Sequence, residues 1–371
     1  NIAPRAEGII LFPQPGKGVV NGKQIHRTFP VNPTQPITAW GLIGAGIRAY
    51  DHMDGVGNRY GVHTVILEVD GEEVFRSVVD RFAYEENRYI NSWTHGQYMK
   101  SFIEPGNRLR MLHASNGNRG LVEINEERPY RFVYTLSDAL GNTSKVRFTV
   151  QGKNTEIHPV EHREKYAFKW ERTNYLQEPG LELVVPRGML YDDVWLDYSV
   201  RADSGDVAFT YQLHNKRVPL HGACEMRIGL RRDRLEDKSK YYVAGVTARG
   251  GKYSIGGTYE DGFMKVRIRD LGTYTVAVDT VPPEIIPLNP GQWGRTGRIT
   301  LKAKDKETGI NSYRGTIDGK YALFGKPNSI SGNLVCELDP KHVKKGGRHT
   351  VEMTVTDGRG NRTTEEFHFV W

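Results

Sequence analysis

Histidine and cysteine are the residues here best suited to hold a metal ion, but their spacing argues against a metal site. His158 and His162 stand four residues apart, the spacing that places two ligands on one helical face. Pro159 follows the first of them directly and disrupts the helix that such a face requires. A second group lies in a predicted loop: His214, His221 and Cys224. Because no His-x-His occurs either, we predict no metal and no cofactor. The alternative is a calcium site in the loop that contains Asp51, Asp54 and Asn58, although EF-hand spacing is absent there.

Catalytic signatures are also absent from the sequence. It has no Gly-x-Ser-x-Gly, no P-loop and no dinucleotide-binding glycine pattern. Acidic residues are plentiful, but a glycosidase pair is defined by separation in space and cannot be identified from sequence. We therefore predict no catalytic residue and a chain that is not itself an enzyme. A surface hydrolase with an unrecognised carboxylate site is the remaining enzymatic alternative.

One stretch, residues 80–110, could bind a ligand without catalysing a reaction. Aromatic rings stack on sugar faces and on bases, and cations placed between them attract anions. The candidate ligand-binding residues are Tyr84, Arg88, Tyr89, Trp93, His95 and Tyr98. In the alternative interpretation, this insertion folds over an open face of a β-sandwich and its rings become core.

The elements that must position this stretch follow a pattern that occurs twice, in residues 49–144 and again in residues 303–363. Each copy contains an Asp-Gly pair between apolar β-formers and closes with Asp-x-x-Gly-Asn. The residues concerned are Asp70-Gly71 and Asp138 to Asn142 in the first copy, and Asp318-Gly319 and Asp357 to Asn361 in the second. An Asp-Gly pair in this setting predicts a hairpin, because both central positions need a positive φ. We interpret the pattern as two copies of one antiparallel module.

The composition predicts an all-β protein made of tandem β-sandwiches. The chain has 371 residues with 41 glycines and 19 tyrosines, and few long amphipathic periods. The predicted domains are an Ig-like sandwich at 1–150 with an insertion at about 80–125, a β-sandwich at 154–280 and an Ig-like sandwich at 281–371. Residues 1–40 and 281–287 are both proline-rich and typical of junctions, so we expect another segment to precede the first domain. No apolar run approaches the length of a transmembrane segment.

The formal net charge of +7 is spread along the chain and favours contact with polyanions. No helix-turn-helix, zinc-finger or RNA-binding pattern is present, so we predict no nucleic-acid partner. An anionic polymer of the cell envelope suits the charge equally well. Cys224 and Cys336 fall in different predicted domains, which favours two buried free thiols over a disulfide.

Five short segments of the first predicted domain carry a family resemblance. They are Gly46–Asp51, Asn58–Val62, Val69–Gly71, Arg88–Asn91 and Pro105–Leu109. They resemble the region after the catalytic domain in lysostaphin-like zinc endopeptidases, peptidase family M twenty-three, of Gram-negative anaerobes. The zinc-binding motifs of that family are absent here. The resemblance therefore implies the non-catalytic C-terminal β region of such an envelope metallopeptidase, without its peptidase domain. Separately, Val184–Leu190 resembles the Pro-x-Gly-x-Leu turn of ZU-five-type β-sandwiches.

The resemblance also implies a role and a location. The expected role is that of an accessory region that positions or regulates a peptidoglycan endopeptidase. The expected partners are peptidoglycan or another envelope glycan, or an envelope protein. The expected location is the periplasm or the outer cell envelope, after secretion. The alternative to this role is a carbohydrate-binding module that uses the aromatic insertion at 80–110.

Overall fold

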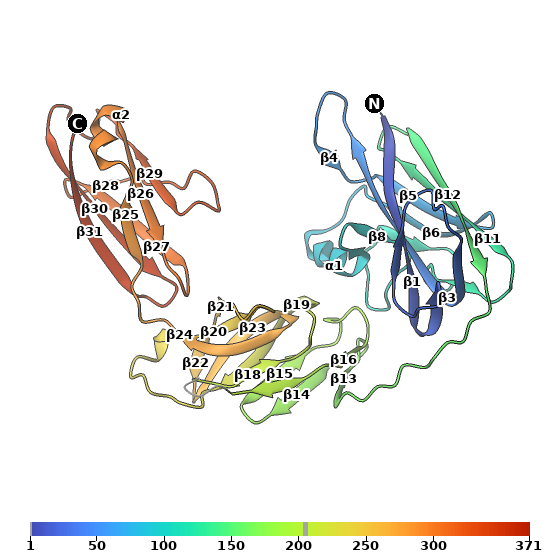
Figure 1. The fold of residues 1–371 in the computed structure, drawn as a ribbon. Coiled ribbons are helices and arrows are strands. Elements are labelled where there is room, and N and C mark those ends of the chain that lie inside the picture. Colours follow the sequence, from blue (N-terminus) through green and yellow to red (C-terminus); the bar gives the residue numbers. More distant parts are fainter. Residues whose placement is uncertain (1, 203–206) are drawn as a thin grey trace. The chain divides into compact units, whose positions relative to one another are not determined.

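The computed structural model describes residues 2–202 and 207–371 of the chain (Figure 1). Strands account for 53% and helices for 5% of the structure, which confirms the predicted all-β fold of tandem β-sandwiches. The chain forms two compact units. The first unit contains Asn1–Asn174, Pro186–Trp195 and Pro219–Gly222, and the second contains Tyr175–Val185, Leu196–Val218 and Ala223–Trp371. The division into three domains stays a prediction.

The first unit is built around one twelve-stranded sheet. Its main strand order is β2-β1-β3-β12-β11-β5-β6-β9, and β4, β7, β8 and β10 branch from this path. These strands are β1 (Ile2–Val20), β2 (Arg27–Phe29), β3 (Ile37–His52), β4 (Arg59–Tyr60), β5 (Thr64–Val69), β6 (Glu72–Val78), β7 (Thr94–His95), β8 (Tyr98–Lys100), β9 (Leu112–Ala114), β10 (Val122–Ile124), β11 (Pro129–Ser137) and β12 (Thr143–Gly152). The short helices η1 (Tyr84–Tyr89) and α1 (Ile90–Trp93) lie in the insertion.

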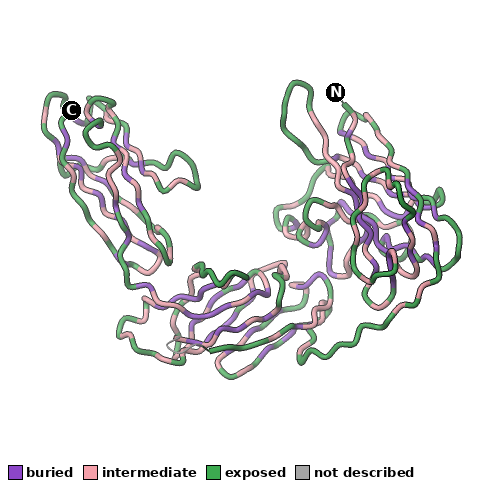
Figure 2. Tube along the Cα trace, viewed as in Figure 1, coloured by how far each residue is buried: buried purple, intermediate pink, exposed green. Residues whose placement is uncertain are grey.

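Alternation of apolar and polar residues builds the core of the first unit. In β11, Tyr130, Phe132, Tyr134 and Leu136 are buried, and the residues between them are more exposed. Figure 2 shows buried and exposed segments along the trace of the chain. Successive side chains of a strand point to opposite faces, so this period of two aims one set into the core. Buried side chains of β1, β3 and β5, among them Ile9, Ile43 and Leu67, join the same cluster.

The remaining strands form five smaller sheets. The two five-stranded sheets have the orders β14-β15-β19-β23-β22 and β17-β18-β24-β20-β21, and a pair β13-β16 stands apart. Their strands are β13 (Tyr166–Phe168), β14 (Asn174–Glu178), β15 (Leu181–Val185), β16 (Val194–Leu196), β17 (Ser199–Arg201), β18 (Thr210–Gln212), β19 (Val218–Gly229), β20 (Tyr241–Val246), β21 (Lys252–Gly256), β22 (Thr258–Glu260), β23 (Phe263–Leu271) and β24 (Thr273–Val278), with η2 (Lys238–Lys240) before β20.

The last sandwich pairs a three-stranded sheet, β25-β26-β29, with a four-stranded sheet, β28-β27-β30-β31. Its elements are β25 (Glu284–Pro287), η3 (Pro290–Gln292), α2 (Trp293–Thr296), β26 (Arg298–Lys304), β27 (Ile310–Ile317), β28 (Lys320–Ala322), β29 (Asn333–Glu337), β30 (Arg348–Asp357) and β31 (Arg362–Val370). The side chains of both sheets and of α2 form one core, with Trp293 its largest fully buried member.

The repeated sequence pattern corresponds to a repeated topology. The four strands β6-β5-β11-β12 of the first unit are neighbours in the same order as β28-β27-β30-β31 of the last sandwich. In both sets an Asp-Gly hairpin joins the first two strands, and the Asp-x-x-Gly-Asn turn joins the last two. This strand order confirms the predicted duplication.

The two copies also share their turn contacts. In the first, Asp70 donates its backbone N–H to the carbonyl of Arg131 and accepts the Arg131 N–H on its carboxylate, at 2.9 and 2.8 Å. In the second, Asp318 does the same with Thr350, at 2.9 and 3.0 Å. Both aspartates have positive φ, near 50°. The local turn chemistry is therefore set by the same residue types in both copies.

Candidate functional site

The aromatic insertion of the first unit does not present its rings together. Tyr84, in η1, is 92% exposed, whereas Trp93, at the end of α1, is only 6% exposed. The Trp93 indole donates its N–H to the carbonyl oxygen of Lys100 at 3.0 Å and belongs to the hydrophobic core. For Trp93, therefore, the structure agrees with the alternative interpretation, in which the insertion contributes to the core.

Arg88 and Tyr89, also candidate ligand residues, make contacts inside the first unit. The Arg88 guanidinium donates to the carbonyl oxygen of Leu220 at 2.8 and 3.1 Å, and the hydroxyl of Tyr191 donates to the Arg88 carbonyl at 2.6 Å. The Tyr89 ring stacks on His221 with 3.9 Å between ring centroids. Burial, together with the nearby Arg88 charge, lowers the pKa of His221. These contacts give Arg88 and Tyr89 structural roles.

His95 and Tyr98 lie on the β7–β8 hairpin. The exposed ring of His95 is 4.6 Å from that of His26 and 5.5 Å from that of Phe12, measured between centroids. The Arg48 guanidinium lies 5.7 Å from the centre of the Tyr98 ring. Ligand binding by Tyr84, His95 and Tyr98 stays a prediction, and the structure does not assemble all six candidates into one surface.

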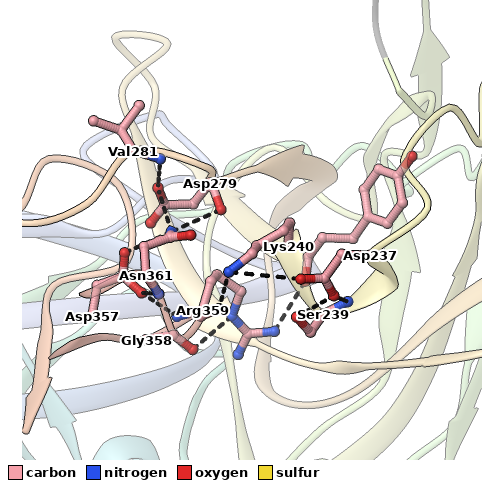
Figure 3. A network of polar contacts seen from close by, with 10 residues as sticks. Asp237, Ser239, Lys240, Asp279, Val281, Asp357, Gly358, Arg359 and Asn361 are labelled. Carbon is pink, nitrogen blue, oxygen red and sulfur yellow. Dashed lines mark hydrogen bonds and ion pairs between the residues drawn. The ribbon is translucent and has the colours of Figure 1, made fainter.

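A polar junction in the second unit, absent from the sequence predictions, connects the turn after β30 to the end of β24 (Figure 3). The buried amide of Asn361 donates to the backbone carbonyl of Asp279 at 3.0 Å and to the carboxylate of Asp357 at 2.7 Å. The hydroxyl of Thr308 donates to the Asp279 carboxylate at 2.6 Å. Tyr242 adds a hydrogen bond from its hydroxyl to Glu307 at 2.6 Å. The junction thus joins β20 and β24 to the last sandwich.

Three carboxylates meet at this junction. One carboxylate oxygen from each of Asp279, Asp305 and Asp357 lies within 4.8 Å of the other two. Asp279 and Asp357 are 1% and 0% exposed. Oxygen-only ligands of this kind suit Ca²⁺ or Mg²⁺, which need about six or more ligands in total. These are the residues that could hold a cation, but their oxygens already accept hydrogen bonds from the protein, including three backbone N–H groups at Asp305.

Arg359 lies at the tip of the turn. The next residue, Gly360, has the left-handed conformation with φ 76°, which glycine adopts without steric cost. Arg359 Nη1 donates to the carbonyl oxygens of Tyr241 and Gly257, both at 3.0 Å. The Arg359 carbonyl accepts from Lys240 Nζ at 3.0 Å (Figure 3). The duplicate turn of the first unit has Leu140 at this position, 79% exposed. An arginine in place of the equivalent leucine was the signal in the sequence that could have revealed the junction.

Residues 165–279 match the family described as the Zu5-like domain. The match includes Val184–Leu190, the segment whose turn resembles that type of sandwich. No curated protein matches the chain.

In the part of the chain that the structure describes, no helix has the length and apolar character to cross a membrane.

Solved structures similar to this chain include those of three proteins. They are SGBP-B of the mixed-linkage glucan utilisation locus of Bacteroides ovatus (10% identity, 100% of this chain and 70% of that chain, TM-score 0.15), a bacterial ice-binding adhesin (10%, 89% and 90%, 0.15) and the human desmocollin-1 ectodomain (12%, 88% and 64%, 0.19). At these TM-scores, the similarities carry no argument about function.

Proposed function

We propose that this chain is a non-catalytic binding protein that holds its partners in position on a scaffold of tandem β-sandwiches. The observation that carries this proposal is the polar junction of the second unit. There, Arg359 and Asn361 bind backbone carbonyls of the preceding sandwich, so hydrogen bonds hold the last sandwich in place and the linker does not act alone. A scaffold needs such fixed spacing between its modules.

We also propose that the scaffold works in the cell envelope, beside a peptidoglycan endopeptidase that it positions or regulates. The resemblance of the segments between Gly46 and Leu109 to the β region of lysostaphin-like peptidases supports this assignment. A protein with a net charge of +7 also suits an anionic envelope polymer. The periplasm or the outer envelope is the location that follows.

The test is incubation of the purified chain with peptidoglycan, with and without added Zn²⁺. We expect the chain to sediment with peptidoglycan or with a peptidase, and to release no soluble fragments. Fragment release that depends on the metal would show that the chain is itself a hydrolase. The absence of any binding to peptidoglycan and to envelope proteins would contradict the positioning role.

A second candidate function, carbohydrate binding by the insertion, is favoured by the exposed ring of Tyr84 and the exposed His95. Because Trp93 is buried, replacing it would disturb folding as well as any site. The informative variants are therefore Tyr84→Ala and His95→Ala, measured on a glycan array. Unchanged glycan binding by both variants would exclude the insertion as the site.

A further inference from the structure

We infer that the groove beside Arg359 binds an oxyanion, either the carboxylate of an acidic sugar or a phosphate group. The groove measures about 440 Å³, lies within the second unit, and opens where η2 and β22 meet the turn after β30. Its lining includes Lys238, Ser239, Thr258, Tyr259 and Arg359. Clefts at the boundary between two sandwiches are common positions for ligand sites.

The charge of Arg359 is the first argument for an anion. The half-buried guanidinium donates only to carbonyl oxygens, those of Gly358 at 2.7 Å and of Tyr241 and Gly257 at 3.0 Å. Within residues 2–202 and 207–371, no carboxylate pairs with it. Arginine stays charged at any pH at which proteins fold, and a partly buried charge without a counter-ion is unfavourable. An external oxyanion would supply the missing charge.

The direction of the guanidinium is the second argument. Three hydrogen bonds to carbonyl oxygens fix its plane, while Nη2 donates no hydrogen bond to any of the described residues. This atom lies 4.0 Å from the place that a Cβ on Gly256 would occupy, at the corner before β22. The N–H groups of Arg359 Nη2 are therefore preorganised for a ligand, which lowers the entropy cost of binding.

The two lysines beside Arg359 already have acidic partners. Lys238 Nζ binds the Asp233 carboxylate at 2.5 Å, and Lys240 Nζ lies 3.8 Å from the Asp237 carboxylate. Arg359 is thus the charge left without an acidic partner. The Tyr259 ring, 5.5 Å from Lys238 Nζ, lines the same groove and offers an aromatic face to a sugar.

The test uses the full chain in isothermal titration calorimetry at constant ionic strength, with glucuronate, inorganic phosphate and neutral glucose as probes. We expect glucuronate or phosphate to bind with one-to-one stoichiometry and glucose not to bind. Arg359→Gln should weaken binding by about tenfold or more, because a charge-assisted contact is lost. Binding of phosphate alone would assign the site to a free anion, and binding of glucuronate alone to the carboxylate of a sugar.

Two further variants distinguish a specific loss of the anion site from a general loss of structure. Thr258→Glu places a carboxylate in the groove without removing any Arg359 bond, and should abolish anion binding in a folded protein. Arg314→Gln removes an exposed arginine of the same sandwich, whose guanidinium lies 5.4 Å from the Tyr321 ring, and should leave the affinity unchanged. The inference fails if the wild type binds neither anion, if Thr258→Glu still binds, or if Arg314→Gln weakens binding as much as Arg359→Gln does.

Discussion

Within the insertion, neighbouring aromatic residues have opposite environments. Trp93 is enclosed by the first core and hydrogen-bonded to Lys100, whereas Tyr84 faces solvent. Burial removes apolar surface from water and fixes the indole, so the Trp93 ring contributes to the stability of the unit. The exposed ring of Tyr84 has no such contribution to lose.

Replacing these two residues should therefore have unequal effects on stability. Trp93→Ala is expected to lower the free energy of unfolding of the first unit by about 3–5 kcal/mol. Tyr84→Ala should change it by no more than about 0.5 kcal/mol. Urea unfolding followed by circular dichroism measures both values. Similar losses in the two variants would contradict the burial assigned to Trp93.

The two cysteines illustrate how burial suppresses reactivity at a single residue. Cys224 and Cys336 are free and buried, as the sequence predicted, and burial raises the pKa of each thiol to about 11. Because the thiolate is the reactive form, both groups should be inert toward a thiol reagent in the folded protein at pH 8. Both should react after denaturation. Rapid labelling of either cysteine in the native chain would overturn this expectation.

At the scale of elements, an aspartate in the Asp-Gly hairpin of the last sandwich forms hydrogen bonds with the neighbouring strand β30. Asp318, in the hairpin between β27 and β28, lies 2.7 Å from the ring nitrogen of the buried His349 in β30 and accepts the N–H of Thr350. The hydrogen bond with His349, followed by that from Thr350, lowers the pKa of the Asp318 carboxyl below its ordinary value of 3.8.

The lowered pKa of Asp318 predicts the direction in which folding stability changes with pH. The pKa of Asp318 is lower in the folded than in the unfolded chain, so its contribution to stability is complete above the unfolded pKa. That contribution disappears as the pH falls through the folded pKa. Asp318→Asn should therefore destabilise the last sandwich at pH 7, and its difference from the wild type should shrink at acid pH.

Unfolding midpoints in urea between pH 7 and pH 2 test this prediction. Asp261→Asn is the matched control, because Asp261 also precedes a glycine in a hairpin with positive φ, and its carboxylate accepts no hydrogen bond from the described residues. The control should show the same pH dependence as the wild type. An Asp318→Asn curve parallel to that of the wild type would rule out the assigned role.

At the scale of the whole molecule, the duplicated turns have separate roles. In the turn from Asp138 to Asn142, the Asn142 amide donates to the Asp138 carboxylate at 2.8 Å. In the turn from Asp357 to Asn361, the amide of Asn361 also reaches the carbonyl of Asp279. In the second copy, the same turn pattern therefore also forms a junction between two sandwiches.

The two asparagines form a matched pair for testing the junction. Asn361→Ala leaves buried acceptors without a donor and should cost about 1–3 kcal/mol. We also expect it to separate the melting of the last sandwich from that of the rest of the second unit. Asn142→Ala should cost less and leave the number of transitions unchanged. Scanning calorimetry measures both effects, and equal losses without a new transition would show that the junction does not couple the sandwiches.

The sequence by itself determined the local features of this protein. Period-two alternation predicts strands, and the pairs Asp70-Gly71 and Asp318-Gly319 predict hairpins, because these signals depend on residues that are close together in the chain. The repetition of both at similar spacing was sufficient to predict the duplicated topology.

Only the tertiary structure decided the burial of Trp93 and the junction at Arg359. The carbonyl oxygens that Arg359 and Asn361 reach in the preceding sandwich belong to residues 82 to 118 positions away in sequence, so no local pattern specifies them. The same physical reason applies to the three carboxylates, which come from separate strand ends and meet only when the second unit folds. Turn chemistry is local, whereas burial and charge pairing are set by how distant segments pack.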